Sequence, residues 1–137
     1  MSRYDNCHHQ VVHALEKDGW QVEAAPLRLE LPERTVYIDI EASRKINGSR
    51  QQVMLAEVKC FPSSKATTTE LYIAVGQYII YRAILIEMRI PTPVYLAVPE
   101  GVYHAVFDSA VQRAFRDSRI KMVIVNLDEE VIKQWIE

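Results

Sequence analysis

The chain has 137 residues, a length that one hydrophobic core usually fills, so we expect residues 1–137 to form a single domain. Apolar residues make up 49% and charged residues 25%, which excludes a disordered chain, a collagen or a coiled coil as the main state. The formal charge is −2, with 16 basic against 18 acidic side chains, so no overall positive charge indicates nucleic-acid binding.

The composition predicts a soluble protein of the cytoplasm. The two cysteines, Cys7 and Cys60, are too few for a secreted disulfide framework and lack paired zinc spacing. The N-terminus has no apolar segment of the kind that a signal peptide needs. The longest apolar stretch, residues 71–86, contains Gln77 and Arg82 and is shorter than the roughly 20 residues of a transmembrane helix. We therefore expect a reducing compartment and no membrane partner.

The chain begins with a predicted helix over residues 5–18, where apolar residues recur at helical spacing. Asp5 or Asn6 can serve as its N-cap, and Gly19 is the expected stop. Alternation of apolar and polar residues then predicts four strands: residues 20–23, 27–31, 35–40 and 53–59.

The last two of these strands are joined by residues 41–52, which we expect to be a polar connection with a turn at Gly48. On the strand over residues 35–40, Ile38 and Ile40 are predicted to share one face, with Asp39 on the opposite face.

The second half of the chain predicts a long helix and further α/β elements. The helix begins near Thr68 or Thr69 and ends before Pro91, and it is apolar almost all round, which favours burial on two sides. A sheet would cover one side, and a partner chain, such as a second copy in a homo-oligomer, is a candidate for the other. The remaining elements are predicted as strands over residues 93–98 and 120–126, two helical pieces within 100–117 and a helical tail over 129–136. This pattern is typical of an α/β sheet with helices on its faces.

Three ionisable side chains meet on the predicted strands. If the strands over residues 35–40 and 53–59 are neighbours, Asp39, Glu57 and Lys59 lie together at one end of a largely apolar face. Unpaired charges buried there would cost on the order of several kcal/mol, so the group needs an explanation. One explanation is a salt bridge in which Lys59 neutralises Asp39 or Glu57.

The other explanation is a site for a divalent metal ion. Asp39 and Glu57 offer the hard oxygen ligands that Mg²⁺ prefers, and Lys59 could orient an attacking water and stabilise a negative transition state. Gln77 and Tyr81 share a face of the long helix, and the Gln77 amide in that apolar run must find a partner. That partner could be a phosphate, a metal-bound water or another helix, and Tyr81 is also consistent with core packing.

An aspartate on one strand, Glu-x-Lys on the next and Gln-x-x-x-Tyr on the following helix resemble the PD-(D/E)XK nuclease superfamily. A narrower resemblance covers nearly the whole chain: the sequence is similar to the XisH family, the fdxN element excision controlling factor proteins of cyanobacteria. The residues that carry it are Ala14-Leu-Glu-Lys-Asp-Gly-Trp20, Tyr37-Ile-Asp39, Ala56-Glu-Val-Lys-Cys-Phe61, Thr69-Glu-Leu-Tyr72, Gly76-Gln-Tyr78, Tyr81-Arg82, Tyr95-Leu-Ala-Val-Pro99 and Glu130-Val-Ile-Lys-Gln-Trp-Ile136.

The resemblance implies a restriction-endonuclease-like fold of the tRNA endonuclease-like kind, with a mixed central sheet flanked by helices. It implies Asp39 and Glu57 as ligands of Mg²⁺, Lys59 as the catalytic lysine and Gln77 as a further site residue. Many superfamily members carry a glutamate on the first helix, and His8 stands near that position here.

The resemblance also implies a role in excising a DNA element during heterocyst differentiation, beside a site-specific recombinase and a companion protein of the XisI family. Two functions follow. The chain is a Mg²⁺-dependent endonuclease acting on DNA, or it is a non-catalytic accessory factor that keeps the fold for assembly. The complete set of Asp39, Glu57 and Lys59 favours the enzyme. The wide apolar face over residues 71–86 and the lack of a basic excess favour the accessory factor.

Three further features belong to neither reading. The first helix begins with Cys7, His8, His9 and His13, where His9 and His13 could chelate Zn²⁺, although a solvated helix face is the commoner case. The amphipathic end near Trp135 could attach to another subunit. A basic run could contact phosphates if its side chains faced one way: Arg113, Arg116, Arg119 and Lys121.

Overall fold

The computed structural model describes residues 7–63 and 65–137 and contains a six-stranded mixed sheet beside a two-stranded hairpin. The elements are α1 (His8–Lys17), β1 (Gln21–Val22), β2 (Leu27–Glu30), β3 (Thr35–Ile38), β4 (Ile40–Asn47), β5 (Arg50–Val58), α2 (Thr67–Glu87), β6 (Val94–Pro99), α3 (Glu100–Val106), α4 (Ser109–Asp117), β7 (Met122–Asn126) and β8 (Val131–Ile136). The order in the large sheet is β1-β4-β5-β6-β7-β8, in which β5, β6 and β7 run parallel and the outer pairs antiparallel.

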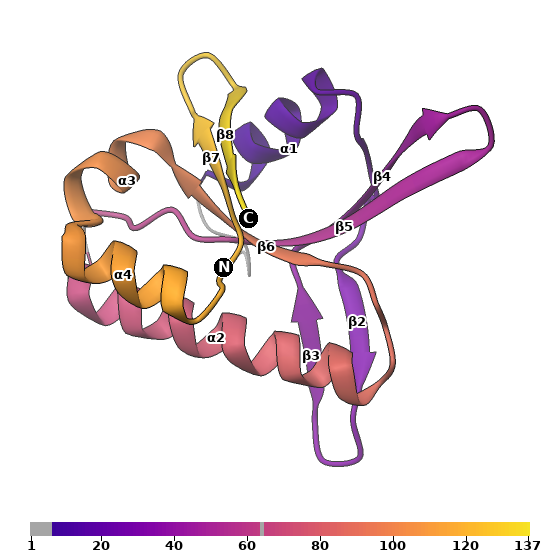
Figure 1. The fold of residues 1–137 in the computed structure, drawn as a ribbon, viewed down its shortest axis with the longest axis horizontal. Coiled ribbons are helices and arrows are strands. Elements are labelled where there is room, and N and C mark those ends of the chain that lie inside the picture. The colour runs from indigo at the N-terminus through magenta and orange to yellow at the C-terminus, as the bar shows by residue number, and fades with distance from the viewer. Residues whose placement is uncertain (1–6, 64) are drawn as a thin grey trace.

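Helices cover both faces of the large sheet, as the sequence predicts (Figure 1). On one face α1 packs against the sheet, with Leu15 and Ala56 in the same apolar core. On the other face α2 and α4 pack against it, where Tyr78 and Phe115 share a core with Leu55. Alternation along β5 therefore sends Ala56 toward α1 and its neighbour Leu55 toward α2. The protein is a mixed α/β fold with a curled central sheet and flanking helices.

The predicted long helix and the two predicted helical pieces after it agree with the structure. α2 covers Thr67–Glu87, and the region over residues 100–117 forms two helices. α1 begins at His8 with Cys7 at its N-cap, and Gly19 follows it in the left-handed region with φ +91°; the proposed caps Asp5 and Asn6 lie outside the described residues. Within the described chain, the helices are too short or too polar to cross a membrane.

The chain changes sheets at Asp39. β3 pairs with β2 in the small sheet, whereas β4 begins one residue after Asp39 and pairs with β5. Ile38 lies in the core beneath α2 and Ile40 lies in the core beneath α1. The prediction that Ile38 and Ile40 share one face of a continuous strand is therefore wrong, because the bend at Asp39 resets the alternation.

Most of residues 41–52 belong to β4 and β5 rather than to the expected polar connection. The pairing of β4 with β5 runs from Ile40 opposite Ala56 to Asn47 opposite Arg50, and the turn falls at Gly48, as predicted. The outer part of this hairpin projects beyond the body of the sheet (Figure 1). Its polar side chains stay in water, and the backbone N–H and C=O groups of β4 and β5 form hydrogen bonds with each other. Low hydrophobicity therefore does not exclude a strand there.

The C-terminal segment is a strand, so the predicted helix over residues 129–136 is wrong. β8 pairs antiparallel with β7 and covers an edge that would otherwise be open. The Trp135 ring lies 6.1 Å from that of Trp20 and 5.1 Å from that of Tyr95. Trp135 therefore anchors the segment to its own domain, while its side chain stays half-buried.

Tyr78 ties α2 to the sheet and gives a prediction about alkaline stability. Its hydroxyl donates to the carbonyl oxygen of Val94 at 2.9 Å and accepts from the Lys121 N–H at 3.1 Å. Burial raises the pKa of Tyr78, so the folded protein keeps this proton at a pH where the unfolded chain, with a pKa of about 10, loses it. The resulting stability is complete below pH ~10 and is lost as the pH rises further.

We expect Tyr78→Phe to lower the free energy of unfolding by about 1–3 kcal/mol at neutral pH, because two buried backbone groups lose their partner. Above pH ~10 the variant should lose stability less steeply than the wild type. The variant should still lose some stability as the pH rises, because burial and Glu137 raise the pKa of Tyr95 as well. Urea unfolding across this pH range measures both effects. Tyr72→Phe is the matched control, since the Tyr72 side chain is 73% exposed, and equal midpoints in the two variants would contradict the prediction.

Candidate functional site

Asp39 and Glu57 lie side by side where β5 passes the junction of β3 and β4. The Asp39 N–H donates to Glu57 Oε1 at 3.2 Å, and the Val58 N–H donates to Asp39 Oδ2 at 2.9 Å. The two residues are only 7% and 6% exposed. The structure therefore brings the two predicted carboxylates together, and each holds the backbone of the other's segment in place.

Lys59 extends β5 by one step. Its backbone N–H donates to the carbonyl oxygen of Ala97 at 2.9 Å, which continues the pairing of β5 with β6, so alternation directs Lys59 to the face of Glu57. The residue is half-buried. Within residues 7–63 and 65–137, Lys59 forms no salt bridge with Asp39 or Glu57. Among the described residues the two acids instead accept backbone hydrogen bonds.

Gln77 lies on α2, the helix that covers the face to which Glu57 projects. Glu57 follows this face because its neighbours on β5, Ala56 and Val58, pack on the α1 side. The Gln77 Oε1 atom is buried and has no hydrogen-bond partner among the described residues. A buried acceptor without a donor costs free energy, so this atom is suited to accept a hydrogen bond from a bound molecule. Tyr81, by contrast, packs against the apolar core beneath α2.

Glu70 is a buried polar residue that the sequence analysis missed. It lies in the first turn of α2, two turns before Gln77, and is 8% exposed. In the part of the chain that the structure describes, its side chain forms no hydrogen bond or salt bridge. Its spacing of seven residues from Gln77 in an apolar helix was the signal that could have found it.

The donor set fits Mg²⁺ better than Zn²⁺. The described residues contain no cluster of three or more His, Cys, Asp and Glu side chains that could hold a metal ion. Two adjacent carboxylates, Asp39 and Glu57, suffice for Mg²⁺, which keeps several of its waters, whereas Zn²⁺ takes three or four protein ligands. The orphaned Gln77 Oε1 is an acceptor for which a metal-bound water is a suitable donor.

The two cysteines form a disulfide, which the sequence analysis did not predict. Cys7 and Cys60 are bonded with their Cα atoms 5.8 Å apart, although 53 positions separate them along the chain. The bond anchors the start of α1 next to Lys59. His8, the first residue of α1, follows Cys7 and therefore lies close to the end of β5.

The zinc site considered for the start of α1 is not formed. Cys7 is consumed by the disulfide, and His8 is buried while His9 is exposed. His13 Nδ1 lies 3.2 Å from Glu130 Oε2. These side chains point to different surroundings and do not converge as metal ligands.

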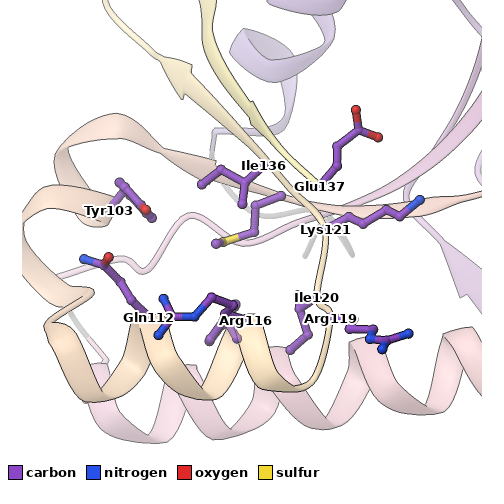
Figure 2. A pocket seen from close by; sticks show the side chains of 10 residues that line it. Tyr103, Gln112, Arg116, Arg119, Ile120, Lys121, Ile136 and Glu137 are labelled. Atoms are coloured by element: carbon purple, nitrogen blue, oxygen red, sulfur yellow. The ribbon is translucent and has the colours of Figure 1, made fainter.

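The basic run divides between a cavity and the solvent. Arg116, Arg119 and Lys121 line a cavity of about 420 Å³ beside the end of β8, whereas Arg113 faces Asp117 at 3.5 Å on the exposed surface. Figure 2 shows Arg116 and Gln112 beside this cavity, across from Ile136. The described lining contains none of the predicted site residues, so this cavity is separate from the acidic pair. The four basic side chains therefore do not all face one way, and the acidic Glu137 lies in the same cavity lining.

Comparisons with known proteins agree with one another. The family model described as XisH protein matches residues 1–133 of the chain. The crystal structure of an XisH family protein from Nostoc punctiforme is 33% identical, with a TM-score of 0.86, and the match covers 97% of this chain and 100% of that one. The crystal structure of a fdxN element excision controlling factor protein from Anabaena variabilis is 32% identical, with a TM-score of 0.84 and the same coverage. None of the curated protein sequences matches.

Proposed function

The chain belongs to the XisH family, and on that premise we propose that it is a nuclease-like factor that controls excision of a DNA element. The name of the Anabaena variabilis relative, an fdxN element excision controlling factor, supports this role. The proposal includes membership of the PD-(D/E)XK superfamily, a restriction-endonuclease-like fold and a part in the DNA rearrangement of cyanobacterial heterocyst differentiation. The observation that carries it is the buried pair of Asp39 and Glu57 with Lys59 on the same face.

The proposed reaction is hydrolysis of a phosphodiester. Asp39 and Glu57 would hold Mg²⁺, which when bound supplies positive charge to the phosphate and a more acidic water. The Lys59 ammonium group would donate hydrogen bonds to the phosphate oxygens as negative charge grows on them. Gln77 Oε1 would accept a hydrogen bond from the attacking water and so orient it. A bond forms between the water oxygen and phosphorus, and the water gives up one proton to solvent. The bond to the leaving sugar oxygen breaks, and that oxygen takes a proton from solvent.

The direct test is a cleavage assay on supercoiled plasmid, branched DNA and single-stranded DNA. We expect nicking in Mg²⁺ or Mn²⁺ and its complete loss in excess chelator, because two carboxylates without the cation repel the phosphate. Titration calorimetry with Mg²⁺ alone should show binding to the wild type and at least about tenfold weaker binding to Asp39→Asn. Absence of both binding and nicking would contradict the proposal.

A second candidate is an accessory factor that keeps the fold without catalysis and acts through a XisI-type companion and a site-specific recombinase. The exposed apolar residues of α2, including Tyr72, Ile80 and Ile86, favour this candidate, since such surfaces commonly bind other proteins. Absence of cleavage together with firm binding of the companion would select it over the enzyme.

A further inference from the structure

The side of α2 that faces away from the sheet is unusually apolar. Hollows on its two flanks separate it from Leu31 and Pro32 of the β2–β3 hairpin and from Val111 and Ala114 of α4. We define the outer face of α2 by six exposed residues: Tyr72, Ile73, Gly76, Ile80, Ala83 and Ile86. Isolated exposed apolar residues are ordinary, but a contiguous set on one helix marks a binding surface.

The centre of the outer face follows a heptad spacing. Ile73, Gly76, Ile80 and Ala83 are separated by three, four and three residues, the spacing of a seam between two helices. Along this seam large and small residues alternate. A Cβ atom placed on Gly76 would meet nothing within 4 Å, so the surface above this glycine is open to an incoming side chain.

The alternation makes the seam complementary to itself in only one orientation. In an antiparallel pair centred near Tyr78, Ile80 lies opposite the partner's Gly76 and Ile73 lies opposite the partner's Ala83. Each large side chain then meets a small one. A parallel pair would set isoleucine against isoleucine and glycine against glycine. The large pairs would be overpacked, and the small pairs would leave cavities. The antiparallel arrangement has two-fold symmetry, so both copies use the same surface, as they would in a parallel pair.

Charge at the helix ends favours the same orientation. The last turn of α2 contains Glu87 and no basic residue, although the C-terminal end of a helix disfavours negative charge. In the antiparallel pair Glu87 lies opposite the partner's Thr69, in the first turn of that helix, where negative charge is favoured.

From this size and charge complementarity we propose that the outer face of α2 binds a second copy of the chain, with the two α2 helices antiparallel. The first test is the mass in solution, by light scattering during size exclusion and by sedimentation. The wild type should have twice the 15.8 kDa of one chain. Ile80→Glu should weaken self-association by about thirtyfold or more, because it sets a charge against the partner's Gly76. Ile46→Glu is the matched control, since Ile46 and Ile80 are both 48% exposed and Ile46 lies on the β4–β5 hairpin.

A charge placed opposite Glu87 tests the orientation. Thr69→Lys should strengthen association, because it sets a cation opposite the partner's Glu87, and adding Glu87→Lys to it should remove that gain. Failure of either effect would overturn the antiparallel arrangement. A wild type that is monomeric at high micromolar concentration, or a dimer that Ile80→Glu and Ile46→Glu affect equally, would overturn the proposal. If Ile80→Glu removes binding of a different protein to a monomeric chain, the occupant is that protein and not a second copy.

Discussion

Replacing Lys59 with alanine is expected to slow metal-dependent DNA cleavage by at least about 100-fold while leaving the fold stable. Lys59 is half-buried, and its side chain forms no hydrogen bond or salt bridge within the described residues, so its removal leaves no protein group without a partner. In the proposed reaction its charge acts on the phosphate, and a charge that acts mainly in the transition state affects the rate more than the stability. Nicking rates at saturating Mg²⁺, measured beside thermal unfolding, separate the two effects.

Lys65→Ala is the matched control for this experiment. Lys65 is an exposed lysine in the segment between β5 and α2, and the proposed site does not use it. We expect the control to cleave at the wild-type rate. Equal rates in Lys59→Ala and the wild type would refute the role of Lys59, and loss of activity with a lowered unfolding temperature would assign it to the fold instead.

Reducing the disulfide between Cys7 and Cys60 should cost the largest share of stability. A cross-link that closes a loop of 53 positions restricts the unfolded chain, and the chain-entropy account gives about 4 kcal/mol for that length. The urea midpoint should therefore fall markedly when a reductant is added. Both cysteines are buried, at 3% and 7% exposed, so reduction should be slow in the folded protein.

The double variant Cys7→Ser with Cys60→Ser provides the control. Its urea midpoint should match that of the reduced wild type and should not respond to the reductant. If the oxidised and reduced wild type unfold at the same urea concentration, the cross-link contributes nothing to stability and the prediction fails.

Local periodicity is enough to predict most of this fold. α1, α2 and the buried strand β6 carry apolar patterns that are complete within a few turns or residues. β8 is different, because residues 131–136 owe their extended form to pairing with β7. The outer arms of the β4–β5 hairpin are likewise strands by pairing and not by composition. Pairing between segments that are distant in the chain cannot be detected in a short window of sequence.

The candidate site divides in the same way. The meeting of Asp39 and Glu57 is predictable, since neighbouring strands bring their polar positions together. The position of Lys59 follows from alternation along β5. The disulfide is not predictable, because 53 positions separate its cysteines. The bend at Asp39 is not predictable either, because residues 35–40 alternate as a single continuous strand would. Both arise from tertiary structure.

The hydrogen bonds that join Asp39 and Glu57 to each other's backbone have an evolutionary consequence. In this arrangement the two acids secure the crossing of the chain from one sheet to the other, whatever else they do. In a relative without the proposed cleavage activity, both acids would still be under selection, since the loss of either would loosen the crossing. Lys59 forms no such backbone contact, so its replacement should be tolerated more readily there.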